Sequence, residues 1–341
     1  MRFERTTVEK TGLLLTFCLL SGLSLAQNLP GPSGPSATGD AAAQHLAPGV
    51  SRVTSPPVGK TAGQSRRTGG DPVDDRVELR EYGFKDTDEN LPYAVFVSSK
   101  VTRDKKAPLV LALHGYSGNH GTFMRTGVVD EAEAGGYILV GVMGYSPSGP
   151  FGNSNMFGAR GARGGTGAPG GRGDGPAAGP AAARGGQPGV RGGRGPAIGG
   201  TKETDAARVS ELSEKDTMTV LAMVRKEFNI DDNRIYLMGH SMGGAGALYL
   251  GEKYAPLWTA VAALAGFGSP DPKGKLKDTP LYLTAGSLDT ASNTGRVLAE
   301  QLKAAGMNCE FKEMPGLDHG GIIAGAMPDV FRFFNEHTKP Q

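Results

Sequence analysis

Hydrophobic and polar positions divide the chain into short apolar runs and amphipathic stretches. Residues 77–84 and 91–98 alternate between apolar and polar side chains, which predicts two strands of a hairpin. Residues 107–115 and 137–144 are continuous apolar runs, typical of strands buried on both faces of a parallel sheet. A helix is expected between these two runs, over residues 122–134.

The C-terminal part continues this alternation of strand and helix patterns. Ser213 is a suitable N-cap for an amphipathic helix, and Asp231 to Arg234 form a polar turn before a short strand at 235–239. Further strands are expected at 258–266, 280–286 and 309–316. Helices are expected at 243–254, at 294–306, where Gly306 ends the helix, and at 328–338. Alternating strands and helices predict an α/β fold with a mainly parallel sheet covered on both faces.

The first 75 residues have a different composition. Arg2, Arg5 and Lys10 precede an apolar run, 12–26, that ends in small residues, so residues 1–26 are predicted to be a signal peptide. We therefore expect a secreted or periplasmic protein that does not stay inserted in a membrane after cleavage. Residues 27–75 contain few large apolar side chains and are expected to be a disordered linker to a domain at 76–341.

A low-complexity insertion interrupts this domain at residues 158–200. It holds 18 glycines, six arginines and one acid, and we expect a disordered loop. It lacks interleaved aromatic residues, and the whole chain has a net charge of only +2, so no nucleic-acid partner is expected. The two cysteines, Cys18 and Cys309, predict no disulfide once the signal peptide is removed. No metal-ligand spacing and no dinucleotide or phosphate-loop pattern is found in a suitable context, so no metal or cofactor is expected.

One short motif carries candidate chemistry. Gly239-His240-Ser241-Met242-Gly243 has the form G-x-S-x-G and lies between a predicted strand and a helix of small residues. In a nucleophile elbow the serine occupies a strained turn, and bulky residues two positions away on either side would collide. The alternative is a tight strand-to-helix crossing in a glycine-rich chain. His240 is expected to be buried and structural.

A serine nucleophile needs a base and an acid that orients it, in the chain order serine, acid, histidine. His319 lies in a loop after a strand, where catalytic groups collect in parallel sheets, and is favoured over His337, a surface residue of the last helix. Asp289, immediately after the strand at 280–286, is favoured as the acid over Asp318, Asp271 and Asp278. A turn or helix cap is the structural alternative for Asp289.

The oxyanion of such a reaction needs two backbone donors. The run LALHGYSGN, residues 111–119, places a His-Gly pair at the end of a strand expected beside the elbow strand. The N–H groups of Tyr116 and Met242 are the predicted donors. His114 precedes the serine and is expected to make structural hydrogen bonds.

The runs PLVLALHGYSGN, FNIDDNRIYLMGHSMGGAGALYL, GSLDT and PGLDHGG, in this order, resemble the α/β-hydrolase superfamily. They are most similar to its secreted esterase branch, which includes polyhydroxybutyrate depolymerases, feruloyl and acetylxylan esterases and prolyl-oligopeptidase-like relatives. The resemblance covers residues 76–338 apart from the insertion. It implies an α/β-hydrolase fold and a triad of Ser241, Asp289 and His319.

The expected activity is hydrolysis of carboxylic esters through an acyl-enzyme, with a small or polymeric ester as substrate. The insertion and the lone cysteine of the mature chain depart from the resemblance and leave the acyl and alcohol groups open. Two alternatives stay open as well. One is a serine peptidase acting on short peptides, and the other is a catalytically silent binding module on a hydrolase fold.

Overall fold

The computed structural model describes residues 50–52, 72–154 and 199–340. The predicted signal peptide, most of the predicted linker and all but Gly199 and Gly200 of the predicted insertion lie outside the described residues, as does Cys18. Within the described part, no helix is both long and apolar enough to cross a membrane.

The described strands form one nine-stranded sheet in the order β1-β2-β3-β5-β4-β6-β7-β8-β9. β1 (Val50–Arg52), β2 (Glu78–Phe84), β3 (Glu89–Val97) and β5 (Ile138–Val142) pair antiparallel. All pairs from β5 to β9 are parallel: β4 (Ala107–Leu113), β6 (Ile230–His240), β7 (Ala260–Leu264), β8 (Leu281–Gly286) and β9 (Cys309–Met314). The predicted hairpin, the α/β class and the mainly parallel sheet are therefore confirmed.

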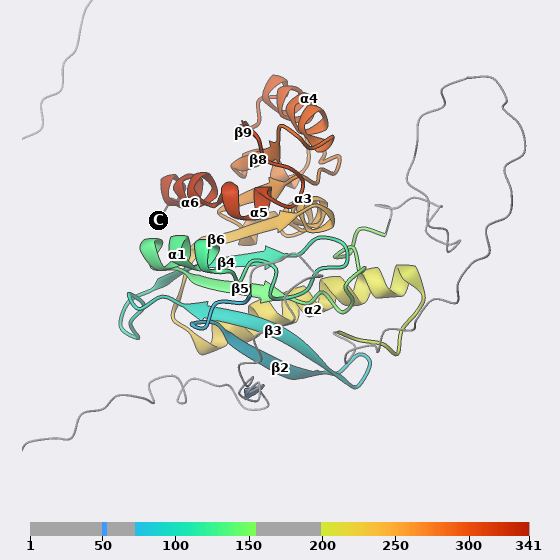
Figure 1. Ribbon diagram of the computed structural model, residues 1–341, viewed down its shortest axis with the longest axis vertical. Coiled ribbons are helices and arrows are strands. Elements are labelled where there is room, and N and C mark those ends of the chain that lie inside the picture. Colours follow the sequence, from blue (N-terminus) through green and yellow to red (C-terminus); the bar gives the residue numbers. More distant parts are fainter. Residues whose placement is uncertain (1–49, 53–71, 155–198, 341) are drawn as a thin grey trace, which may run out of the picture. The chain divides into compact units, whose positions relative to one another are not determined.

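Helices cover both faces of this sheet (Figure 1). Residues of α2 (Ala206–Glu227), α3 (Met242–Lys253) and α4 (Ala291–Ala304) belong to one core cluster with Leu109, Leu111 and Leu113 of β4. Residues of α1 (Thr126–Gly135), α5 (Ile322–Gly325) and α6 (Met327–Glu336) pack with Val110 and Ala112 of the same strand. The continuous apolar run of β4 thus feeds two cores, because successive side chains of a strand point to opposite faces. Two short 3₁₀ helices, Ala255–Leu257 and Lys275–Asp278, complete the described elements.

Three local expectations were wrong. The first concerns the start of α2, whose N-cap is Asp205, with its side chain accepting the N–H of Arg208. Ser213 lies inside the helix, where its Oγ donates to the carbonyl of Val209. The helix extends toward its N-terminus because Leu212 is buried in the core and Val209 packs against it.

The second is the polar turn at 231–234, which is part of β6. Ala107 pairs with Ile230 but Leu109 pairs with Ile235, so β6 carries extra residues in a bulge. Asp231 stabilises this bulge through hydrogen bonds from the N–H of Asn233 and the Nε of Arg234.

The third is the domain boundary at residue 76. β1, in the segment predicted as a disordered linker, pairs with β2 through Val50↔Tyr82 to Arg52↔Arg80. Edge pairing of this kind uses backbone groups and needs no apolar run, so composition gave no sign of it. Asp74 also belongs to the domain, since its N–H donates to the carbonyl of Met124. A smaller difference is that α1 begins at Thr126 rather than 122.

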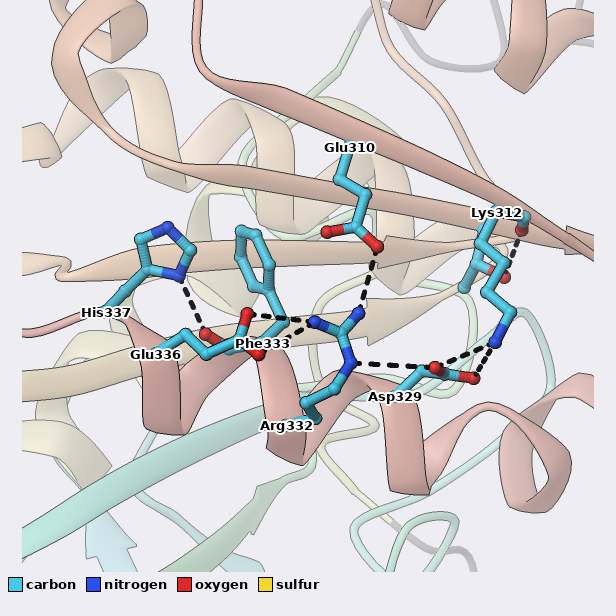
Figure 2. A network of polar contacts seen from close by, with 8 residues as sticks. Glu310, Lys312, Asp329, Arg332, Phe333, Glu336 and His337 are labelled. Atoms are coloured by element: carbon cyan, nitrogen blue, oxygen red, sulfur yellow. Dashed lines mark hydrogen bonds and ion pairs between the residues drawn. The ribbon is translucent and has the colours of Figure 1, made fainter.

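Charged side chains connect α6 to the edge strand β9 (Figure 2). Lys312 of β9 contacts Asp329 at 2.7 Å, and Arg332 contacts Glu310 of β9 at 3.0 Å. Arg332 also contacts Glu336 one helical turn further on. These contacts link the two elements that flank residues 315–326, the segment that contains His319.

Candidate active site

Ser241 lies at the junction of β6 and α3, as expected for an elbow. Its φ and ψ are 54° and −116°, a region that non-glycine residues rarely adopt. Its N–H donates to the carbonyl of Leu264 on β7 at 2.8 Å, which fixes the turn to the neighbouring strand. Strain held in place by the surrounding structure is typical of a functional site.

The two glycines of the motif are required by close backbone approaches. A Cβ on Gly239 would lie 2.0 Å from the carbonyl oxygen of Gly243. A Cβ on Gly243 would lie 2.1 Å from the carbonyl oxygen of Leu113 on β4. Any side chain at either position would force backbone to move, so these glycines are steric requirements of the elbow.

The structure brings Ser241, His319 and Asp289 together. Nε2 of His319 lies 2.9 Å from Oγ of Ser241, and Nδ1 lies 2.6 Å from Oδ2 of Asp289. The Asp289 side chain is 6% exposed and the His319 side chain 50% exposed, so a buried carboxylate supports an imidazole at the surface. The other carboxylate oxygen of Asp289 accepts the N–H of Ala291, which makes this residue a turn former as well.

The loops that carry Asp289 and His319 are joined to each other. The N–H of Ser287 donates to the carbonyl of Met314, and that of Leu288 donates to the carbonyl of Leu317. Oγ of Ser287 accepts the N–H of Gly316. The acid and the base therefore follow different strands, β8 and β9, but lie on loops that are hydrogen-bonded to each other.

The expected oxyanion donors flank the serine. Met242 is the first residue of α3, where backbone N–H groups have no partner within the helix. Gly115 packs against the elbow, since a Cβ on it would lie 3.3 Å from Cβ of Ser241. Tyr116, the next residue, is 62% exposed at the same edge.

His114 and His240 are buried beside these groups. The ring nitrogens of His114 each lie 2.7 Å from a carbonyl oxygen, those of Gly115 and Met143. Burial lowers the pKa of His114. Both contacts are structural, as predicted for His114. His240 contacts the backbone of His319, a residue 79 positions away that no local pattern could have indicated.

The rival residues lie elsewhere or have other partners. Nδ1 of His337, at the end of α6, lies 2.7 Å from the carbonyl oxygen of Phe333. His337 is half-buried rather than fully at the surface. Asp318 accepts the N–H of Gly321, and Asp271 accepts that of Lys273. Asp278 contacts Lys277 at 3.9 Å.

Leu288 was missed by the sequence reasoning. It is 70% exposed and directly precedes Asp289. Its position next to the predicted acid was the available signal. Among the described residues, no cluster of three or more His, Cys, Asp or Glu side chains is arranged to hold a metal ion.

Comparisons with known proteins bear on the family and on the fold. Residues 207–313, which run from α2 to β9, match the family model described as a putative esterase. No curated protein sequence is significantly similar to the chain.

Solved structures share the fold. An S-formylglutathione hydrolase from Agrobacterium tumefaciens aligns with a TM-score of 0.52 and 17% identity over 77% of this chain and 95% of that one. A ferulic acid esterase from Anaeromyces mucronatus, solved with ferulic acid, aligns with a TM-score of 0.51 and 16% identity. This alignment covers 76% of this chain and 90% of that one. A thermostable esterase aligns with a TM-score of 0.50 and 20% identity over 78% of this chain. The alignment covers only 64% of that esterase's length. The described residues therefore have the α/β-hydrolase fold, and residues 207–313 are similar to the esterase family.

Proposed function

We propose that the chain hydrolyses carboxylic esters through Ser241, His319 and Asp289. The observation that carries this proposal is the continuous hydrogen-bonded path from Oγ of Ser241 through His319 to Asp289, at 2.9 and 2.6 Å. A serine hydroxyl is a weak nucleophile at neutral pH, and this path supplies the base and its orienting acid.

The reaction proceeds in two halves. Oγ of Ser241 attacks the ester carbonyl carbon while Nε2 of His319 takes the hydroxyl proton. Asp289 accepts the Nδ1–H bond and stabilises the imidazolium. When the carbonyl bond re-forms, the alcohol leaves with the proton from His319. Water then attacks the acyl-enzyme by the same steps in reverse, which releases the acid and free Ser241.

The negative charge on the carbonyl oxygen forms beside the N-terminus of α3. The N–H groups of Met242 and Tyr116 are the proposed donors. Loss of one such donor typically costs about 10²–10³ in kcat. The helix dipole of α3 favours the same charge.

Two exposed apolar side chains that are sequence neighbours of site residues support a substrate with an apolar part. Tyr116 and Leu288 are two of the three large hydrophobic side chains exposed among the described residues, and both adjoin site groups. The third, Val297, lies on α4. Large apolar side chains gathered at a site mark a contact surface for an apolar ligand group. The likeness to a ferulic acid esterase solved with its aromatic acid is consistent with this choice.

The test is hydrolysis of p-nitrophenyl acetate and butyrate by the chain from residue 27 onward, which keeps β1. Ser241→Ala, His319→Ala and Asp289→Asn should each lower kcat by about 10³-fold or more with the fold intact, because each removes one member of the path. A fluorophosphonate should label Ser241 in the wild type. If the wild type reacts no faster than Ser241→Ala and takes no label, the silent binding module is the correct alternative.

A panel of matched ester and amide substrates separates the esterase from the peptidase alternative, since the residues would be the same. Faster cleavage of short peptides than of esters would favour the peptidase.

We also propose that the protein is secreted or periplasmic, supported by the charged and apolar pattern of residues 1–26. N-terminal sequencing of the exported protein should begin at Gln27, and recovery of an intact N-terminus from cells alone would contradict it.

A further inference from the structure

His240 joins three parts of the candidate active site. It is the last residue of β6, directly before Ser241, and is 7% exposed. Its Nε2 lies 2.7 Å from the backbone carbonyl oxygen of His319. Its ring centroid lies 4.8 Å from that of the His319 imidazole, at an interplanar angle of 56°. The residue beside the nucleophile thus reaches the main chain of the base.

The direction of this hydrogen bond follows from the protonation state of the ring. Burial lowers the pKa of His240 to about 4, so the ring is neutral near pH 7 and carries one proton. A carbonyl oxygen can only accept, so that proton resides on Nε2. Nδ1 faces the oxyanion loop, where a Cβ on Gly115 would lie 2.9 Å from it.

The segment around His319 is otherwise fastened mainly to itself and to the Asp289 loop. The N–H of Gly321 donates to Asp318, that of Ile322 donates to the carbonyl of Asp318, and Gly316 donates to Ser287. None of these bonds reaches β6, which holds the nucleophile. The bond from His240 therefore connects the base loop to the strand that positions Ser241.

We propose that His240 is a positioning residue for His319. Its Nε2–H bond to the His319 carbonyl holds the imidazole within hydrogen-bonding distance of Ser241 Oγ throughout the reaction. The inference rests on the proposed catalytic role of His319. It goes beyond that role because it assigns a task to a residue that does not touch the substrate.

The physical reason is the sensitivity of proton transfer to geometry. Nε2 of His319 must take a proton from Ser241 and then deliver it to the leaving oxygen. A displacement of about 1 Å can cost about 10²-fold in rate. A neutral ring at 4.8 Å also adds no positive charge beside the imidazolium that forms during turnover.

The test compares substitutions that differ in where they place a donor. The side-chain amide of His240→Gln reaches the position of Nε2, whereas that of His240→Asn reaches only the position of Nδ1. His240→Leu fills the space with no donor. With p-nitrophenyl butyrate, we expect His240→Leu and His240→Asn to lower kcat by about 10²-fold with KM within about two-fold. His240→Gln should recover kcat to within about tenfold of the wild type.

Equal kcat values for the Gln, Asn and Leu variants, at equal folded fractions measured by circular dichroism, would overturn the proposal. A wild-type kcat in folded His240→Leu would do the same. If the Leu variant does not fold, the comparison of Gln with Asn decides by the same criterion.

One measurement needs no variant. ¹⁵N NMR of the histidine rings in the wild-type protein should show His240 as the Nε2–H tautomer at pH 7. The Nδ1–H tautomer would contradict the proposed bond. This readout also separates the two proposals, because a wild type no more active than Ser241→Ala would refute ester hydrolysis while the tautomer still reports the contact.

Discussion

Ser241 and its immediate neighbours show how much of the candidate site depends on single residues. The serine has a φ of 54°, and Gly239 and Gly243 leave room for the backbone that this conformation brings close. His319 and Asp289 have side chains of very different exposure, 50% and 6%. The exposed imidazole can meet the substrate, while the buried carboxylate has little freedom to turn away.

Leu288 allows a prediction about the substrate at this scale. Leu288→Ser should raise KM for p-nitrophenyl butyrate by about fivefold, since it removes apolar contact worth about 1 kcal/mol. The KM for p-nitrophenyl acetate should change by less than about twofold, because the acetyl group offers less apolar surface than the butyryl group. Steady-state kinetics on both esters measures the difference.

Val297→Ser is the control for Leu288, because it removes the third exposed large apolar side chain, which lies on α4. It should leave both KM values unchanged. An equal response of the two esters to Leu288→Ser would show that Leu288 does not contact the acyl group.

At the scale of elements, the site is assembled where strands end and helices begin. β6 delivers Ser241 and α3 begins immediately after it, while the loops after β8 and β9 deliver Asp289 and His319. In a parallel sheet these ends lie along one edge, which is why residues distant in sequence meet there. The ion pairs between α6 and β9 in Figure 2 connect the two elements on either side of the His319 segment.

The packing of β6 against α3 makes a second prediction. Gly239→Ala should lower the free energy of unfolding by about 2–3 kcal/mol and abolish activity, since its Cβ meets backbone of the following helix at 2.0 Å. Gly127→Ala, in α1, has no atom within 4 Å of the new Cβ. It should raise stability by up to about 1 kcal/mol.

Urea unfolding of both variants measures the two changes side by side. A Gly239→Ala variant as stable as Gly127→Ala would mean that the elbow has room for a side chain at that position. The fluorophosphonate label on Ser241 then reports whether the elbow still works.

At the scale of the whole molecule, hydrogen bonds connect segments that are far apart in the sequence. Glu89, the first residue of β3, accepts the N–H groups of Thr201 and Lys202 and the hydroxyl of Tyr145. These bonds join the sheet to the segment that begins at residue 199, where the described part of the chain resumes. Burial raises the pKa of Glu89, but its hydrogen-bond donors, the Thr201 N–H foremost, outweigh this and hold the pKa at about 2.

This low pKa gives a prediction about acid stability. A carboxylate whose pKa is depressed in the folded state stabilises the protein above its unfolded value of 4.5. The wild type should therefore exceed Glu89→Gln by about 1–2 kcal/mol at pH 7, after allowance for partial exposure. This difference in the free energy of unfolding should shrink below pH 4.5 and vanish near pH 2. Urea titrations at pH 7, 5, 4 and 3 measure it, and a constant difference would contradict the assignment.

The sequence alone predicted the candidate site residues, because the chemistry of such a site depends on residue types in fixed local patterns. The apolar runs predicted the parallel strands, and the motif around Ser241 with the chain order serine, acid, histidine selected Asp289 and His319. The same reasoning failed where stability comes from distant partners. Ser213 is a suitable N-cap by residue type, but burial of Leu212 extends the helix to Asp205.

The sequence by itself determined the α/β class, the strands that carry the site and the identity of its candidate residues, because periodicity and steric motifs are local properties. Only the tertiary structure decided that β1 joins the sheet edge and that residues 231–234 form a bulge in β6. It also decided that His240 reaches the carbonyl of His319, 79 residues away. Backbone pairing and hydrogen bonds between distant segments depend on where the chain returns in space, and no local pattern of side chains encodes that position.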